Sequence, residues 1–172
     1  MECSFIEPTN HYIVNGTKGL DYFNDYILRL NGFEGEINEK TGLNAACFFG
    51  KRDIMLRGNT SEEGERIKNL INTLIKTNNA NNVSYFKVEL DLKNDGSLSI
   101  YNIYEVLSKS ILKAIEKQED TCPVCTALHM DQSIPHIHVL WINKDDININ
   151  RDIISDNFIS DVMKDFGKKI NE

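Results

Sequence analysis

Three of the four histidines in this chain lie within ten residues, at His129, His136 and His138, and an apolar run follows the last of them. Successive side chains of a β-strand point to opposite faces of a sheet. His136 and His138 would therefore share one face, and Ile137 would lie on the other. A short turn at residues 132–135 would pair this strand with the preceding one, which carries His129. The spacing predicts an antiparallel β-hairpin in which three imidazoles meet on one face of a sheet.

Clustered histidines are chemically suited to a metal site, because a neutral imidazole offers a nitrogen lone pair. Three nitrogen donors with an open side are typical of a catalytic site, and imidazole favours Mn, Fe, Ni, Cu or Zn over Mg. Asp131 would orient a histidine ring or bind the metal through water, or it only starts the turn. A structural role for the cluster is the alternative, although burying an imidazole without a partner costs roughly 1–3 kcal/mol.

The length of 172 residues predicts one domain covering residues 1–172. Helical spacing of apolar residues occurs at 17–30, about 61–77, 101–118 and about 151–170. Strand patterns occur at 43–50, 53–57, 83–92, 122–130 and 136–143. Strands pair locally as hairpins, and helices separate the groups of strands. This order predicts a two-layer α+β domain, in which a central, mainly antiparallel sheet carries the histidine hairpin and helices pack on it.

Charge and hydropathy narrow the function classes. The formal net charge is −7, which argues against an extended nucleic-acid surface because phosphate-binding proteins are usually basic. A metal ion and a few Lys and Arg side chains can still make a small site locally positive. No apolar run approaches the ~20 residues of a membrane-spanning helix, and the N-terminus lacks signal-peptide features. We therefore expect no membrane association and a cytoplasmic location.

The cysteines do not form a disulfide framework. The chain has four of them, too few for its length. Cys122 and Cys125 match a C-x-x-C pattern, but the partner pair that a zinc knuckle would need is missing. We interpret both as strand residues, with a redox or zinc role as the alternative, and Cys47 as a core residue.

The string His129-x-Asp131-x-x-x-Pro135-His136-x-His138 resembles the metal-binding motif of plasmid mobilisation relaxases of the Mob/Pre type. These belong to the HUH endonucleases, a group named for two histidines that flank a hydrophobic residue. The resemblance covers this hairpin, and the order of elements before it is compatible with the group. It implies a relaxase-like fold. It also implies that the three histidines hold a divalent cation, usually Mn²⁺ or Mg²⁺, with Zn²⁺ as a further option.

The resemblance also implies an activity, namely metal-dependent nicking and rejoining of single-stranded DNA in plasmid mobilisation or replication initiation. The partners would be origin-type single-stranded DNA and other mobilisation proteins. The cation polarises the scissile phosphate while an in-line nucleophile attacks it. The nucleophile is a tyrosine in most of the group and an N-terminal histidine in some mobilisation relaxases. His11 is therefore the first candidate for this catalytic residue and Tyr12 the second, and an ordinary surface role is the alternative for His11.

The other tyrosines are weaker candidates for the nucleophile. Tyr22 and Tyr26 stand about one helical turn apart and are predicted to be packing residues, since tyrosine commonly buries its ring beside a polar rim. Tyr85, Tyr101 and Tyr104 are reserve candidates.

Departures from the family pattern favour two other functions. Gln132 stands where the family has a glutamate, and the basic residue nearest to His11 is Lys18. One alternative is a relaxase-like module that binds DNA or another protein without cleavage. The other is a metal-dependent hydrolase of small phosphoesters. A covalent DNA adduct would distinguish nicking from binding alone, and multiple turnover of small substrates would indicate the hydrolase.

Overall fold

The computed structural model describes residues 2–6, 12–13, 18–28, 45–49, 52–57, 61–77, 82–91, 99–118, 121–129, 134–143 and 155–171. The strands are β1 (Glu2–Ile6), β2 (Tyr12–Ile13), β3 (Ala45–Phe49), β4 (Arg52–Arg57), β5 (Asn82–Asp91), β6 (Thr121–His129) and β7 (His136–Asn143). The helices are α1 (Lys18–Leu28), α2 (Ser61–Thr77), α3 (Ile100–Glu116) and α4 (Asp156–Ile170).

The seven described strands form one sheet in the order β1-β5-β7-β6-β3-β4, and β2 also pairs with β5. Every pairing is antiparallel. β7 lies in the middle of the sheet, between β5 and β6. The predicted hairpin is confirmed, because His129 pairs with His136 and Leu128 with Ile137. The histidine cluster is therefore carried by two adjacent inner strands.

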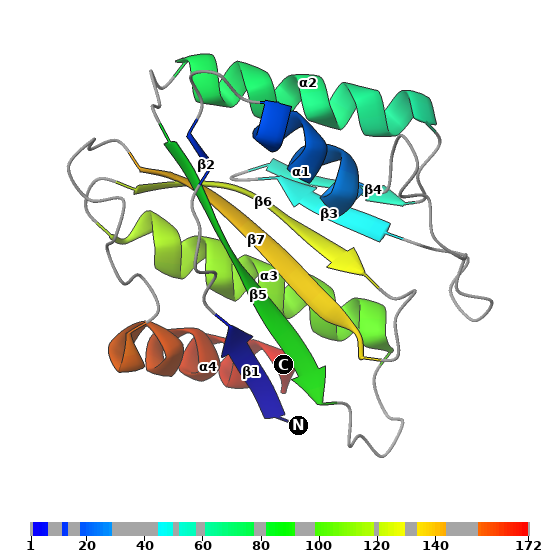
Figure 1. Cartoon of the computed structure of the whole chain (residues 1–172). Coiled ribbons are helices and arrows are strands. Elements are labelled where there is room, and N and C mark those ends of the chain that lie inside the picture. Colours follow the sequence, from blue (N-terminus) through cyan, green and yellow to red (C-terminus); the bar gives the residue numbers. More distant parts are fainter. Residues whose placement is uncertain are drawn as a thin grey trace.

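One face of the sheet packs against α3 and α4. Ile137, Val139 and Trp141 of β7 point to this face and join the apolar side chains of the two helices in one buried cluster. Side chains alternate along β7, so the odd-numbered residues 137, 139 and 141 point to this face and the even-numbered residues point to the other. Figure 1 shows α3 and α4 together on this side of the sheet.

The opposite face carries the histidines and packs against α1 and α2. Ile27 and Leu28 of α1 and Ile67 of α2 are buried with Leu140 and Ile142 of β7. Figure 1 shows α1 and α2 on the other side of the sheet from α3 and α4. The predicted α+β class, with helices packed on an antiparallel sheet, is confirmed. The structure adds that helices lie against both faces of that sheet.

Helix ends follow local capping. The Ser99 hydroxyl accepts a hydrogen bond from the Asn102 amide at 3.1 Å, so α3 begins at Ile100. The Ser155 hydroxyl accepts one from the Phe158 amide at 3.1 Å, so α4 begins at Asp156, later than the apolar pattern predicts. A serine at this position satisfies an amide that has no partner inside the helix.

The described elements account for two further expectations. Cys125 of β6 is buried among the apolar residues beneath α1 and α2, as expected for a strand residue. The side chains of Cys47 and Cys122 lie outside the described part of the structure. Among the described helices, none combines the length and the apolar character required to cross a membrane.

Candidate metal centre

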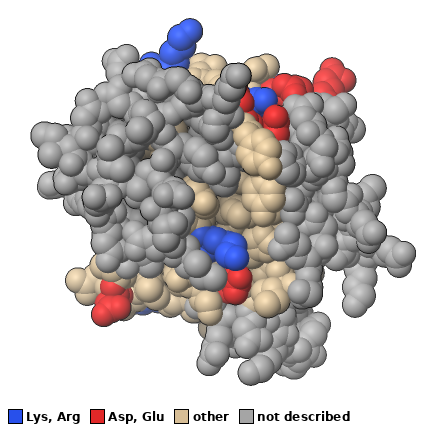
Figure 2. Space-filling model, viewed as in Figure 1, with Lys and Arg blue, Asp and Glu red and all other residues tan. Residues whose placement is uncertain are grey.

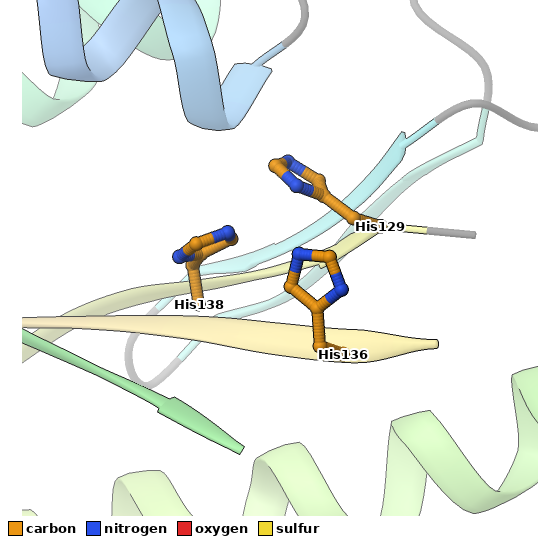
Figure 3. A group of neighbouring side chains, drawn as sticks. All are labelled: His129, His136 and His138. Atoms are coloured by element: carbon orange, nitrogen blue, oxygen red, sulfur yellow. The ribbon is translucent and has the colours of Figure 1, made fainter. Parts of the chain in front are cut away.

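The three clustered imidazoles face one another on the α1 side of the sheet. His129 ends β6, and His136 and His138 begin β7. His136 is directly opposite His129, and Ala127 is opposite His138, so all three side chains leave the same face. Figure 3 shows the rings pointing into a common space beneath α1. Their centroids are 4.6 Å apart for His129 and His138, 5.0 Å for His136 and His138, and 5.1 Å for His129 and His136.

The geometry of the cluster fits a metal ion. One ring nitrogen from each histidine lies within 4.8 Å of the other two. A point equidistant from three donors within that spacing is at most about 2.8 Å from each, and zinc–imidazole bonds are about 2.0–2.1 Å. Small rotations of the rings are enough to bring the donors to bonding distance. The exposed fractions are 0% for His129, 3% for His136 and 4% for His138, so the donors lie almost entirely away from bulk water.

Backbone carbonyls set which nitrogen of two rings bears the proton. Nε2 of His129 lies 2.8 Å from the Ile27 carbonyl oxygen, and Nδ1 of His136 lies 3.0 Å from that of Ile134. A carbonyl oxygen only accepts, so these two nitrogens donate. In the neutral rings, the lone pairs then belong to Nδ1 of His129 and Nε2 of His136. Metal-binding histidines are commonly oriented by such a bond from the second ring nitrogen.

Helix α1 lies over the cluster through its last turn. The carbonyls of a helix's last turn have no partner within the helix, and His129 donates to one of them, that of Ile27. The ring of Tyr26 meets the rings of His129 and His138 edge-on, with centroids 5.5 and 5.4 Å apart. The C-terminal end of α1 therefore contacts two of the three candidate ligands.

An ion pair connects α1 to α2 next to this contact. Nζ of Lys68 donates to Oδ1 of Asp25 at 2.9 Å. Burial alone would lower the pKa of Lys68. The hydrogen bond and charge of Asp25, with the charges of Asp21 and Glu65, outweigh burial and raise that pKa above its ordinary value. The pair therefore favours the position of α1 that covers the histidines.

The structure describes only part of the predicted site. It brings His129, His136 and His138 together, and the identity of the metal stays a prediction. His11, Asp131 and Gln132 lie outside the described residues. The backbone of Tyr12 belongs to β2 and pairs with Val83 of β5, but its side chain is not described. The assignments of His11 and Tyr12 as nucleophiles therefore stay predictions.

The tyrosines differ from one another in a way that the sequence did not predict. Tyr26 packs as expected, but it packs against the histidines themselves. Tyr22 is 63% exposed, so its ring is not buried as we predicted for a packing residue. Tyr104 is buried on the α3 side, where its hydroxyl lies 3.2 Å from the Thr126 carbonyl oxygen.

Two charged residues beside the cluster were also missed. Lys87 and Glu89 of β5 are opposite His138 and His136 of β7. Alternation along β5 already placed both on one face of their strand. It carried no signal that this face is shared with the histidines, because β5 and β7 are far apart in the sequence.

Comparison with known proteins adds no assignment. No family model, no curated protein and no solved structure matches this chain. The functional argument therefore depends on the histidine centre and on the residues around it.

Proposed function

We propose that this chain is a metal-dependent single-strand DNA transesterase of the HUH relaxase type, which nicks and rejoins one strand. The observation that carries the proposal is the convergence of His129, His136 and His138, with one ring nitrogen from each within 4.8 Å of the others. The order of these residues along the hairpin, which resembles the relaxase motif, selects this activity among the reactions that such a centre supports.

The protein groups would divide the work as follows. The three imidazoles hold the cation, and the carbonyls of Ile27 and Ile134 keep two rings in the required tautomer. A cation bound there polarises the scissile phosphate and stabilises the charge that develops on it. Low exposure of the imidazoles limits competition from water for the same positions.

Three residues are candidates for the nucleophile on different grounds. The resemblance favours His11 first and Tyr12 second. Among the tyrosines whose side chains are described, Tyr26 has its ring against the cluster. In each case a bond forms between the nucleophile and the phosphorus, and the bond from phosphorus to the 3′-oxygen breaks. The nucleophile loses its proton, and the departing oxygen gains one to become a 3′-hydroxyl.

The test combines metal binding with covalent capture. The protein is titrated with Mn²⁺ and then incubated with single-stranded oligonucleotides of randomised sequence, labelled at the 3′ end. We expect a labelled protein band that survives denaturation. His136→Ala should abolish Mn²⁺ binding and the band together, while circular dichroism shows that the variant is folded.

Matched variants identify the nucleophile. Tyr26→Phe removes the hydroxyl of the ring that packs against the cluster, and Tyr22→Phe makes the same change at an exposed position on the same helix. His11→Ala and Tyr12→Phe test the alternatives. The band should disappear with one of Tyr26→Phe, His11→Ala and Tyr12→Phe, and it should persist with Tyr22→Phe.

Other outcomes would reject the proposed activity in distinct ways. Mn²⁺ binding without any covalent band would indicate a DNA-binding module that does not cleave. Repeated turnover of bis(p-nitrophenyl) phosphate without a band would indicate a small-substrate hydrolase. Absence of Mn²⁺ binding by the unaltered protein would reject the metal centre itself.

A further inference from the structure

A pair of opposite charges borders the histidine cluster on the β5 side. Lys87 is directly opposite His138, and Glu89 is directly opposite His136. Residues paired in this way on antiparallel strands share a face, with Cβ atoms roughly 4.5–5.5 Å apart. One ammonium group and one carboxylate therefore belong to the same surface as the imidazoles.

These two side chains contact each other and remain accessible. Nζ of Lys87 lies 2.9 Å from Oε1 of Glu89, and the side chains are 34% and 32% exposed. The neighbouring imidazoles are buried. Figure 2 shows basic and acidic atoms adjoining each other near the centre of the visible face. The ion pair is thus accessible to solvent beside a buried candidate metal centre.

The arrangement of the helices explains this accessibility. Helix α1 packs over β3, β6 and β2, and α2 packs over β6. Strand β2 pairs with β5 only at Asn82 and Val83, away from Lys87 and Glu89. On the far side of β5, Glu89 is opposite Ser4 of β1, whose side chain is exposed. Within the described part of the chain, the Lys87–Glu89 end of β5 is therefore a side from which an elongated substrate can approach the histidine face.

A pair of this kind can exchange its partner. An ion pair between partly exposed side chains contributes only about 0–1 kcal/mol, so an incoming anion can displace one member. Lysine acts as a point charge in phosphate binding and does not require a fixed orientation of the anion. The carboxylate neutralises the lysine until an anion arrives, which suits a chain with a net charge of −7.

We propose that Lys87 binds a backbone phosphate of single-stranded DNA next to the metal centre and leaves Glu89 when it does so. This inference rests on the proposed function, and it adds a phosphate subsite that the histidine motif does not include. Glu89 acts as a competing anion in this site, and its removal should strengthen DNA binding.

The experiment measures binding of a labelled oligothymidylate to the Mn²⁺-loaded protein across a series of salt concentrations. Lys87→Met should weaken binding on the order of tenfold at low salt and reduce the slope of log affinity against log salt by about 0.7, the value for one contact to a single strand. Glu89→Gln should tighten binding severalfold. Affinity for Mn²⁺ should be unchanged in both variants.

Lys109→Met is the matched control. Lys109 lies on α3, on the opposite side of the sheet, and forms a similarly exposed ion pair with Glu105 at 3.0 Å. Its replacement makes the same change in net charge and should leave the affinity and the salt slope unaltered.

Three results would overturn the inference. Equal effects of Lys87→Met and Lys109→Met would show that only net charge matters, and the proposed function would stand. Loss of Mn²⁺ affinity in Glu89→Gln would make the carboxylate a metal ligand and not a competing anion. If the unaltered protein binds no Mn²⁺, the proposed function and this inference fail together.

Discussion

The two faces of the sheet are built from the same strands, yet only one of them is a continuous apolar core. On the α3 and α4 face, the ring of Phe86 lies 5.4 Å from that of Trp141 and 5.9 Å from that of Phe158, measured between centroids. Two buried polar side chains there have hydrogen-bond partners: the Thr126 hydroxyl donates to Ser108 at 2.9 Å, and the Tyr104 hydroxyl lies 3.2 Å from the Thr126 carbonyl oxygen.

The α1 and α2 face has apolar packing over part of its area and three buried imidazoles over the rest. Burying polar rings opposes folding unless they find partners. A continuous core on the other side of the same strands can offset that cost. We infer that the α3 and α4 face stabilises the fold and that the α1 and α2 face holds the candidate metal centre. Variants on both faces test this division.

The largest effect is expected on the apolar face. Phe86 is fully buried between Phe5, Trp141 and Phe158. Phe86→Ala should lower the free energy of unfolding by about 3–5 kcal/mol, because it removes buried area and leaves a cavity. Urea denaturation measures this loss, and Phe86→Leu should lose less. Mn²⁺ affinity of the folded protein should be unchanged, and a lost metal site would contradict the division between the faces.

A smaller and conditional effect is expected on the histidine face. His138→Leu replaces a buried candidate ligand with an apolar side chain of similar size, so the metal-free protein should change little in stability. The unaltered protein should gain about 2.7 kcal/mol at a Mn²⁺ concentration one hundred times the dissociation constant. The variant should show no such gain when its thermal unfolding is compared with and without Mn²⁺.

Thr126→Val is the control for the histidine change. It also replaces a buried polar group on the central strands, but it removes a hydrogen bond to Ser108 on the apolar face. It should destabilise the metal-free protein by about 1 kcal/mol and keep the gain from Mn²⁺. Equal behaviour of the two variants would show that the faces do not differ as we infer.

The smallest effect is expected at the edge of the apolar face, where α3 meets α4. Hydrogen bonds from Lys169, Lys113 and Ser110 hold the pKa of Asp165 below its ordinary value of 3.8, against the opposing effect of burial. A lowered pKa in the folded state adds stability above about pH 4, and this stability disappears as the pH falls further. Asp165→Asn should therefore cost about 1 kcal/mol at pH 7 and progressively less below pH 4.

Chemical denaturation at several pH values measures this dependence. Asp161→Asn changes an exposed residue on the same helix and is the control. It should leave the free energy of unfolding unchanged at each pH. A cost for Asp165→Asn that does not vary with pH would mean that the charge of Asp165 is not the cause.

Local patterns in the sequence predicted the hairpin and most of the elements. The alternation of His136, Ile137 and His138 identified both faces of β7, because side-chain direction in a strand depends only on position. The helical spacing of 61–77 and 101–118 agrees with α2 and α3 to within two residues at each end. These signals are contained in a few neighbouring residues, so they can be recognised without the fold.

Contacts between distant segments could not be predicted in this way. The bond from His129 to Ile27, the packing of Tyr26 against the cluster and the position of Lys87 beside His138 all depend on which elements pack together. Which elements pack together depends on the burial of apolar residues over the whole chain. The residues next to Tyr26 or Lys87 in the sequence therefore do not indicate these contacts.

The alternation along β7 restricts how the length of this hairpin can change. Its residues His136 and His138 carry imidazoles on one face, and Ile137, Val139 and Trp141 fill the apolar core on the other. Inserting or deleting one residue within β7 would exchange the faces of all the residues on one side of the change. Changes of two residues would keep each set on its own side, so viable length variants of this segment should differ by even numbers.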